Sequence, residues 1–473
     1  MSSKIIRDPL YDYISIDRDR DPWLLELLDT PEVQRLRRIH QLGISYLTYP
    51  GADHNRLAHS LGVVHLTQQA FEHLARISSD DPRIRQGRAA VLASAMIHDV
   101  GHGPFSHLFE PCLGADHEVW SRAIILSEES AVSQVLTRHF DSDFPRQIAS
   151  LIDPNNHDQP AWQKYLLSSQ LDMDRLDYLR RDSLFTGAGY GHYDWYRLLN
   201  TFQLYEDDDS GWDIVWSEKS LLAIEEYIYS RYYMYQNVYL HKTTRGFEKM
   251  LEAMWRRARE FHDGGVDVGL LPAIRAFWDA QSRSPRGDGR GEATVRQYLA
   301  IEEFTVMSQI QAWQGHADRA LSDLARRFLE RRRFAMIEAP SFDDPFAPDF
   351  EGWEAALLEL VGDWVGPGVP AEMYCLRDQL NARYSQSYFP EKESDEQSGK
   401  NAIRVLVEGE PKPVEVSRLR PRLQPLTQGL TDRVRYYLPR ELKETALRLR
   451  DEWSRNGRSA KTLGSIPPGS VEW

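Results

Sequence analysis

The stretch MIHDVGHGPFSH, residues 96–107, holds three histidines and one aspartate, and a further histidine, His117, follows ten positions later. The whole chain has 15 histidines in 473 residues, so a random window of this size would hold fewer than one. Imidazole and carboxylate groups at this density are typical of a metal site and of general acid–base catalysis. The pattern alone leaves both kinds of chemistry open.

The pair His98–Asp99 stands where a strongly apolar helix is expected to end, because Gly101, Gly103 and Pro104 follow it and turn the chain. Adjacent imidazole and carboxylate groups at a helix end can both face one ion. Of the two further ligands that are needed, His59 is offered by another predicted helix. The stretch LDMDRLDYLRRD offers the aspartates Asp172, Asp174, Asp177 and Asp182. Such a set without sulfur suits Mn, Fe, Mg or Zn, and spacing does not select the ion.

Signatures of other chemistries are missing from the sequence. There is no GxxxxGK[ST] phosphate loop, GAGYGH does not fit the GxGxxG dinucleotide fingerprint, and no GxSxG nucleophile elbow occurs. Acyl transfer and hydride transfer therefore lose most of their support.

The composition predicts an ordinary soluble protein. Its formal charge is −14, so nucleic acid is possible as a partner but is not indicated by charge. The two cysteines, Cys112 and Cys375, form no CxxC pair, which favours a reducing compartment and disfavours cysteine-bound zinc. The sequence has no apolar signal region and no run of the roughly 20 apolar residues that a membrane span needs. We expect a cytoplasmic protein without a membrane partner.

Hydrophobic periodicity and helix-capping residues predict a mainly helical chain. An extended arm covers 1–21, and alternating aromatic residues predict a β-hairpin over 201–216. From about residue 370, short β-type runs occur at 402–409, 413–419 and 433–439, and the tail is expected to be frayed. The predicted helices cover 30–42, 56–77, 85–100, 117–127, 130–140, 144–152, 170–185, 219–261 and, in part, 292–338.

The order NRLAH, HD and DMDRLDY resembles the H…HD…D pattern of the HD-domain phosphohydrolases. Further blocks within residues 4–245, including PGADHNRLAHSLGV and HDVGHGPFSH, resemble the dNTP triphosphohydrolase branch, although no SAM domain precedes the HD motifs. This resemblance implies a mainly α fold, with an HD-domain helical core, small β-hairpin insertions and a smaller α+β C-terminal lobe. The core would cover 1–340, with HD motifs in 56–182 and a long helix at about 219–261, and the lobe would cover 341–473.

The resemblance also implies roles for individual residues in hydrolysis of a dNTP to a deoxynucleoside and triphosphate. One divalent metal would be held by His59, His98, Asp99 and Asp174. The reacting phosphate would face His102, His107, Glu110, His117 and Glu118, with His117 or His102 giving a proton to the leaving oxygen. The substrate would contact Gln41, Leu42, Arg56, Arg175, Tyr178, Asp182, Arg231 and Tyr239. The sequence departs from the family at Arg175, usually Lys, at Glu110, where the close relative has Asp, and at Leu240, usually polar.

Regulation is a further implication, because the close relatives assemble as tetramers around nucleotide effectors. A guanine nucleotide, GTP or dGTP, would contact Lys4, Asp29, Gln34 and Arg37. An adjoining effector pocket, to which additional Mg could come with the nucleotide, would include Arg197, Lys219, His241 and Lys242, while Ser217, Ala223 and Arg7 depart from it. A plainer interpretation is that Asp29 favours a helix start and that Gln34 and Arg37 form a solvated face.

Two other functions stay open. The same metal centre would serve another HD-type phosphohydrolase, such as a nucleotidase, a phosphodiesterase or a single-strand nuclease. A non-catalytic nucleotide sensor is the other alternative, although such a protein is expected to have lost a ligand. We expect structural roles for the remaining histidines His54, His65, His73 and His157. The sequence does not indicate the preferred dNTP, the native metal or the role of the C-terminal lobe.

Overall fold

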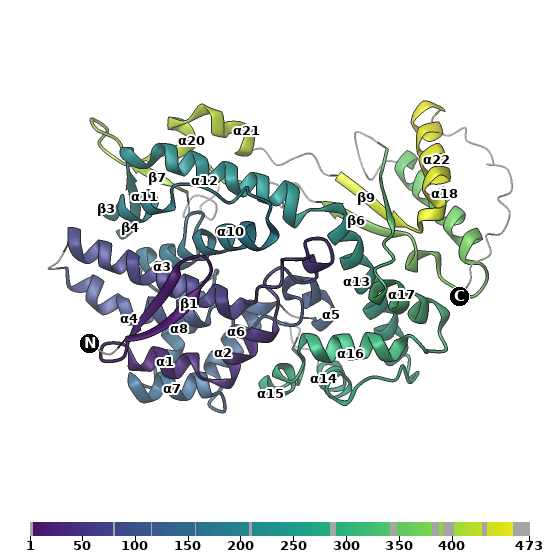
Figure 1. Cartoon of the computed structure of the whole chain (residues 1–473), viewed down its shortest axis with the longest axis horizontal. Helices are drawn as coiled ribbons and strands as arrows, with labels where there is room; N and C mark the ends of the chain where they lie inside the picture. Colours follow the sequence, from purple (N-terminus) through teal and green to yellow (C-terminus); the bar gives the residue numbers. More distant parts are fainter. Residues whose placement is uncertain are drawn as a thin grey trace. The chain divides into compact units, whose positions relative to one another are not determined.

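The computed structural model describes residues 3–78, 81–114, 116–156, 158–207, 211–283, 290–340, 348–380, 387–390, 402–427 and 433–456. It divides into two compact units (Figure 1). The first unit comprises 1–239, 276–303 and 386–429, and the second comprises 240–275, 304–385 and 430–473. This division differs from the expected lobes 1–340 and 341–473, because each unit takes residues from both.

The first unit is built around two long helices, α3 (Arg56–Ile77) and α4 (Pro82–Ile97), which pack against each other. Their buried apolar residues belong to one continuous core. The surrounding helices are α1 (Pro22–Leu28), α2 (Pro31–Arg35), α5 (Glu110–Leu113), α6 (His117–Leu126), α7 (Ala131–His139), α8 (Phe144–Ile152), α9 (Ala161–Leu167), α10 (Met173–Thr186), α11 (Trp195–Asn200), α12 (Leu221–Met234), α14 (Pro272–Ser282), α15 (Val295–Leu299), α20 (Val416–Leu419) and α21 (Gln424–Thr427).

Side-chain caps fix where the key helices of this unit begin. Asn55 accepts a hydrogen bond from Ala58 N (3.1 Å) ahead of α3, and Asp172 accepts one from Arg175 N (2.7 Å) ahead of α10. Such caps satisfy backbone N–H groups that have no partner within the helix. The helix predicted over 56–77 is confirmed, and those predicted over 117–127, 130–140, 144–152 and 170–185 are confirmed to within a few residues.

Two small sheets complete the first unit. Strands β1 (Ser3–Asp8) and β2 (Asp12–Asp17) form an antiparallel hairpin at the N-terminus, and β2 lies against α3. The predicted hairpin over 201–216 is confirmed as β3 (Phe202–Asp207) and β4 (Gly211–Ser217). Strand β4 also pairs in parallel with β7 (Arg404–Leu406), which pairs with β8 (Val414–Glu415), so the sheet order is β3-β4-β7-β8.

The helix predicted over 30–42 ends earlier than expected. After α2, a 3₁₀ turn covers Leu36–Arg38, and Ile39 then adopts an extended conformation. The chain at this point runs beside the start of α3, where Arg56 N donates to Ile39 O (3.0 Å) and Gln41 N donates to His54 O (3.0 Å). These long-range backbone hydrogen bonds outweigh the local apolar periodicity, so the prediction is wrong beyond Arg38.

The single helix predicted over 219–261 is also wrong. Helix α12 passes into a π-helical turn, Tyr235–Tyr239, and α13 (Lys242–Asp263) begins separately. The side chain of His241 accepts a hydrogen bond from Thr243 N (3.2 Å) and caps the new helix. Insertion of π geometry into an α-helix frequently marks a functional site.

The second unit packs helices against a three-stranded antiparallel sheet of order β5-β9-β6. Helix α13 lies on this sheet, and a Cβ atom at Gly246 would come within 2.9 Å of the Tyr437 ring, so the approach requires glycine. Residues 335–338, expected to be helical, form β5 because they pair with β9. The remaining elements are β5 (Ala335–Glu338), β6 (Leu376–Leu380), β9 (Arg433–Leu438), α16 (Glu303–Trp313), α17 (Arg319–Leu329), α18 (Pro348–Val365) and α22 (Lys443–Asn456).

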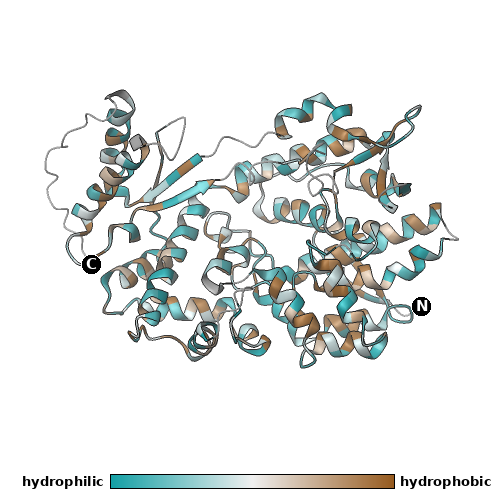
Figure 2. Ribbon diagram, turned by 180° about the vertical axis from the view of Figure 1, so that it is seen from behind, coloured by the Kyte–Doolittle hydropathy of each residue, from teal (hydrophilic) through white to brown (hydrophobic). Residues whose placement is uncertain are grey.

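Apolar and polar residues alternate along the helices, as expected for helices with one buried face (Figure 2). Within the described ranges, no helix has the length and apolar character needed to cross a membrane.

Candidate metal centre

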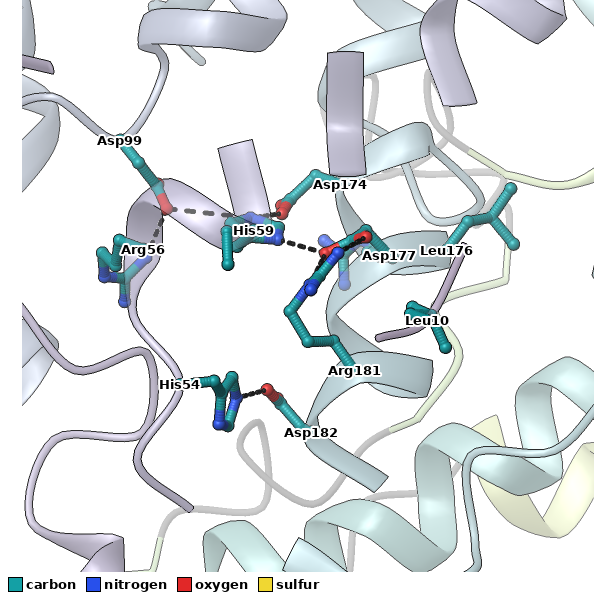
Figure 3. Close-up of polar contacts among 12 residues, drawn as sticks. Leu10, His54, Arg56, His59, Asp99, Asp174, Leu176, Asp177, Arg181 and Asp182 are labelled. Carbon is teal, nitrogen blue, oxygen red and sulfur yellow. Dashed lines mark hydrogen bonds and ion pairs between the residues drawn. The ribbon is translucent and has the colours of Figure 1, made fainter. Parts of the chain in front are cut away.

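Three helices of the first unit bring the four predicted metal ligands together. His59 lies in the first turn of α3, His98 and Asp99 directly follow α4, and Asp174 lies in the first turn of α10. His59 Nε2 is 2.9 Å from Asp174 Oδ1 and 3.7 Å from Asp99 Oδ2. His98 Nε2 is 3.3 Å from Asp99 Oδ1 and 3.8 Å from Asp174 Oδ1. Figure 3 shows His59 between Asp99 and Asp174. His59 and Asp174, which are 115 positions apart in the sequence, are thus in direct contact.

The other ring nitrogen of each histidine is anchored. His59 Nδ1 lies 2.8 Å from Asp177 Oδ2, and His98 Nδ1 lies 3.0 Å from Ala95 O. Both Nε2 atoms are buried, and neither has a hydrogen-bond partner of good geometry in the described part of the chain. Metal-binding histidines usually donate the second N–H to such an acceptor, which directs the remaining lone pair at the ion. The two imidazoles and Asp99 bring ligand atoms within 4.8 Å of one another, as a divalent cation needs. Asp174 adds a carboxylate oxygen beside both Nε2 atoms.

The electrostatics of the centre also favour positive charge. Burial lowers the pKa of the His59 imidazole, but the carboxylates of Asp174 and Asp177 raise it to about 10. Burial likewise raises the pKa of Asp174, but His59 and His98 hold it well below its usual value. The carboxylates are therefore ionised, and a proton on His59 occupies a place that a cation would take.

Arg56, predicted to grip the triphosphate, is instead engaged with a ligand. Its Nη1 is 2.5 Å from Asp99 Oδ2, and its Nε donates to Ser106 Oγ (2.7 Å). The guanidinium is buried, so it neutralises and orients Asp99 (Figure 3). Its contact with a phosphate stays a prediction.

Next to the ligands lies a second group, formed by His102, His107, Glu110 and His117. Glu110 Oε1 is 3.0 Å from His107 Nδ1 and 2.7 Å from His117 Nδ1. The ring of His102 stacks on that of His117, with centroids 3.8 Å apart, and His102 Nε2 is 3.3 Å from Asp99 Oδ1. The Glu110 oxygen thus already binds two imidazoles, which suits proton transfer and anion binding better than it suits a second metal.

Burial separates the members of this second group. The His102 side chain is 1% exposed, that of His117 is 19% exposed and that of His107 is 67% exposed. Burial, with Arg56 and His117 nearby, holds the pKa of His102 well below its usual value. Glu118, beside His117, is half-buried, and burial raises the pKa of its carboxyl. His117 is therefore better placed than His102 to reach a bound substrate.

The segment between the two groups has unusual backbone geometry. Phe105 and Ser106 have φ angles of 56° and 57°, a left-handed conformation that costs energy for residues other than glycine. Gly101 has ordinary φ but packs closely on α6, where a Cβ atom would lie 2.1 Å from Ser121 N. The turn that was expected from Gly103 and Pro104 is thus made largely by the two residues after them.

Three residues that sequence reasoning missed hold this segment. Arg35 Nη1 donates to His102 O (2.7 Å), and Tyr298 OH donates to Gly101 O (2.6 Å). Glu303 Oε1 accepts from Phe105 N (3.1 Å). Two of these side chains come from residues nearly 200 positions away, and all of them bind backbone groups, so no motif reveals them.

Further from the ligands, basic and tyrosine side chains gather on α10, α12 and the π-helical turn. Arg175 Nε donates to Ser169 O (2.6 Å), and Arg231 Nη1 donates to Ser387 O (3.0 Å). Arg231 Nε is buried and has no partner among the described residues. Burial raises the pKa of Tyr235, but Arg231 and Arg175 bring it below its usual value. Tyr235 was not predicted as a site residue, and the direction of its pKa reflects the two guanidinium groups near it.

Asp182 and Tyr239, predicted to contact the substrate, meet each other and His54. Asp182 Oδ1 is 2.7 Å from His54 Nε2, and Tyr239 OH donates to Asp182 Oδ2 (2.8 Å). His54 was expected to be structural, yet it holds a predicted site residue. The Tyr178 ring lies 6.4 Å from that of Tyr239, and burial raises the Tyr178 pKa well above its usual value.

Gln41 and Leu42, predicted to contact the sugar, lie in or against the core, and two of the remaining histidines have structural partners. Gln41 is buried, with Oε1 unpartnered in the described part of the chain, and Leu42 packs partly against the core. His73 Nε2 is 2.7 Å from Phe202 O and His65 Nε2 is 2.9 Å from Gln69 Nε2, so both hold structural positions. His157 lies outside the described residues.

The predicted effector residues lie on several elements of the two units. Lys4 is exposed on β1. Asp29, Gln34 and Arg37 lie near the α1–α2 junction, where Gln34 Oε1 accepts from Arg37 Nε (2.7 Å). The first unit also holds Arg197 and Lys219, and the second holds His241 and Lys242. Nucleotide binding at any of them stays a prediction.

Comparison with known proteins agrees with this geometry. The HD domain model matches residues 56–182, and the HD associated region matches residues 193–268. Uncharacterized protein YwfO of Bacillus subtilis (strain 168) is 35% identical over 394 residues, which are 83% of each chain. The deoxynucleoside triphosphate triphosphohydrolase SAMHD1 homolog of Dictyostelium discoideum is 28% identical over 278 residues, which cover 55% of this chain and 50% of that one.

A solved structure extends the likeness over nearly the whole chain. The crystal structure of a phosphohydrolase from Bacteroides thetaiotaomicron VPI-5482 superposes with a TM-score of 0.73 at 25% identity, covering 93% of this chain and all of that one. Matching motifs, fold and ligand set lead to one conclusion: the chain belongs to the HD-domain phosphohydrolases.

Proposed function

We propose that the protein is a metal-dependent deoxynucleoside triphosphate triphosphohydrolase. The observation that carries this proposal is that the Nε2 atoms of His59 and His98 both face the carboxylates of Asp99 and Asp174, beside a separate histidine group anchored by Glu110. One group suits a cation and its water, and the other suits proton transfer to a leaving oxygen.

The metal centre would be completed by Asp99 and Asp174. A bound divalent cation would polarise a phosphate oxygen and lower the pKa of a water molecule. Arg56 orients Asp99 and keeps it ionised, and the anchored Nδ1 atoms keep both imidazoles in the tautomer that a metal needs.

Recognition of the triphosphate requires local positive charge, because the polyphosphate carries roughly four negative charges and the chain has a formal charge of −14. Arg175 and Arg231 supply this charge beside Tyr235. The buried, unpartnered Nε of Arg231 has a donor to spare for a phosphate oxygen.

His117 is the proton donor in this scheme. Its Nδ1 faces Glu110, which leaves Nε2 to carry the proton, and its ring is more exposed than that of His102. The oxygen of water forms a bond to the α-phosphorus as the bond to O5′ breaks. O5′ takes the proton from His117, and the proton that the attacking water loses returns through solvent to His117, so a nucleoside and triphosphate result.

The sugar would lie against the Asp182–His54–Tyr239 group. Asp182 accepts hydrogen bonds and suits a 3′-hydroxyl, and Leu42 offers an apolar contact that disfavours a 2′-hydroxyl. The buried Oε1 of Gln41 is a further acceptor. The name of the Dictyostelium relative supports this choice of substrate class.

The test is a product assay on the full chain supplied with Mn²⁺ or Mg²⁺. Each dNTP is supplied alone, in mixtures and with GTP, and the release of triphosphate is measured, with Asp99→Ala as the inactive control. Release from dNTPs is expected. Hydrolysis only of nucleoside monophosphates, cyclic dinucleotides or single-stranded DNA would assign another HD-type reaction, and nucleotide binding without turnover would assign a sensor.

A further inference from the structure

We infer that the turn of the N-terminal β1–β2 hairpin is a positioning part of the metal centre, with Asp8 and Tyr11 acting on His59 through Arg181 and Asp177. The inference rests on the metal centre of the proposed function and is independent of its substrate.

Asp177 is the direct support of His59. Its Oδ2 lies 2.8 Å from His59 Nδ1, the ring nitrogen that does not face the other ligands, and Figure 3 draws this contact. An ionised carboxylate at this place keeps the proton on Nδ1 and the lone pair on Nε2, and it fixes the rotation of the ring. Asp177 is therefore a positioning residue that does not itself touch the ion.

Asp177 is held in turn by two donors. Arg181 Nε donates to Oδ2 (2.8 Å) and Arg181 Nη2 donates to Oδ1 (3.0 Å), and both side chains are 0% exposed. Tyr11 OH, from the hairpin turn, donates to Oδ1 (2.9 Å). A buried carboxylate needs this compensation of charge and hydrogen bonding, so the position of Asp177 depends on Arg181 and Tyr11.

The hairpin turn reaches Arg181 through Asp8. Asp8 Oδ2 accepts from Arg181 Nη1 (2.8 Å), while Asp8 Oδ1 accepts from Leu10 N (2.9 Å) and Tyr11 N (3.1 Å). One carboxylate thus shapes the turn and binds the arginine. A displacement of the turn would move Tyr11 and Arg181 together.

The neighbouring helix leaves space for this pair of side chains. A Cβ atom at Gly62 on α3 would lie 1.9 Å from Asp177 Oδ1 and 2.6 Å from Arg181 Nη2. Only glycine at this position, one turn after His59, lets α3 approach the buried carboxylate and guanidinium. The packing of α3 therefore accommodates the ion pair rather than a simple apolar contact.

His98 provides the contrast. Its Nδ1 is anchored by Ala95 O, a backbone atom of its own helix, so it needs no support from a distant segment. His59 is thus the ligand that a change in the hairpin would disturb.

The test compares Asp8→Asn, Tyr11→Phe and Asp177→Asn with a matched control. Asp21→Asn removes one partner of another buried ion pair in the same unit, in which Asp21 Oδ1 is 2.7 Å from Arg88 Nη1, away from the metal centre. Each full-length protein is loaded with Mn²⁺ or Co²⁺. The metal content, the metal affinity in competition with a chelator, the Co²⁺ absorption spectrum and the thermal midpoint are measured.

We expect Asp177→Asn to weaken metal affinity by about 10- to 100-fold and to alter the Co²⁺ spectrum. Asp8→Asn and Tyr11→Phe should cause smaller losses of the same kind. Asp21→Asn should lower the thermal midpoint without changing metal affinity. Since Asp8 acts through Asp177, the double variant that carries both Asp8→Asn and Asp177→Asn should bind metal as weakly as Asp177→Asn alone.

The inference is overturned if Asp8→Asn and Tyr11→Phe keep the metal affinity and Co²⁺ spectrum of the native protein. It is also overturned if the double variant loses the sum of the single effects. Should Asp177→Asn fail to fold, the two hairpin variants still decide the question. Because no readout uses a nucleotide, failure of dNTP hydrolysis leaves this test intact.

Discussion

Two histidine groups lie side by side in the first unit, and they differ in what their ring nitrogens bind. In the ligand group, the Nδ1 atoms of His59 and His98 are anchored and both Nε2 atoms face carboxylates without a proper hydrogen bond. In the neighbouring group, one oxygen of Glu110 binds the Nδ1 atoms of His107 and His117. Our proposal that the first group holds the cation and the second transfers a proton rests on this difference.

The comparison shows that composition alone cannot separate a metal site from an acid–base site. Both groups are rich in histidine, and each brings at least three possible ligand atoms within 4.8 Å of one another. A ligand atom, however, must have a lone pair that no proton donor occupies. The hydrogen-bond partner of each nitrogen, rather than the residue type, carries the distinction.

The largest expected effect comes from Asp99→Ala. This change removes a ligand and leaves the buried guanidinium of Arg56 uncompensated. We expect loss of bound metal and a fall in kcat of at least about 10⁴-fold, since the cation supplies several kcal/mol of transition-state stabilisation. Metal content and triphosphate release measure the two losses. Metal kept at full occupancy in this variant would contradict the assignment of the ligand group.

His117→Ala should impair the group formed by His102, His107, Glu110 and His117 and leave the metal ligands intact. We expect kcat to fall by about 10²- to 10³-fold, as for loss of a general acid, with metal content unchanged. His73→Gln, outside both groups, is the control and should keep native activity. If His117→Ala lost its metal together with its activity, His117 would contribute to metal binding as well as to proton transfer.

The ligand set His59, His98, Asp99 and Asp174 was implied by the resemblance to the HD-domain motifs, since the residues alone left four aspartates open. Asn55 caps α3 and Asp172 caps α10, and these caps set where His59 and Asp174 fall. Short-range signals of this kind survive without tertiary information. Helices α3, α6, α7, α8 and α10 were predicted from local signals of this kind.

The supports of the site could not be predicted, because they join distant segments. Tyr298 and Glu303 bind the backbone of residues 101–105 across nearly 200 positions. Neither contact leaves a periodic or motif-like signal. The early end of the 30–42 helix has the same cause, since Ile39 pairs with the backbone of Arg56. At Ile39, long-range backbone pairing overrides local propensity.

Thermal stability should respond to metal only through the ligand group. At a free Mn²⁺ concentration of about 100 times Kd, binding to the folded state adds about 2.7 kcal/mol. We expect the thermal midpoint to rise with Mn²⁺ and to fall with a chelator in both the native protein and His117→Ala. Asp99→Ala should show neither change. A chelator effect that depended on His117 would place a cation in the second group instead.

The smallest expected effect concerns the ion pair of His40 and Glu303, called the clamp, which holds the backbone of Phe105 between the two histidine groups. His40 Nδ1 pairs with Glu303 Oε2, and His40 Nε2 lies 3.7 Å from Asp53 Oδ1, with the Tyr46 ring beside it. Burial lowers the pKa of His40, but Glu303 raises it above its usual value. The folded state therefore binds the proton more tightly than the unfolded state does. The resulting stability is fully present below the unfolded pKa of about 6.5 and is lost as the pH rises through the raised folded pKa.

This clamp is tested by the free energy of unfolding of the native protein and of His40→Gln, measured near pH 5.5 and near pH 8.5. The native protein should have a higher free energy of unfolding than His40→Gln, and this difference should be larger at the lower pH by about 0.5–1 kcal/mol. The effect is small because the pair is partly exposed and screened. Other titrating groups are common to both proteins and cancel in the difference. If the difference in free energy of unfolding stayed constant or grew toward pH 8.5, His40 would hold Glu303 as a neutral hydrogen-bond donor. The contact would then stabilise the fold without a charged imidazole.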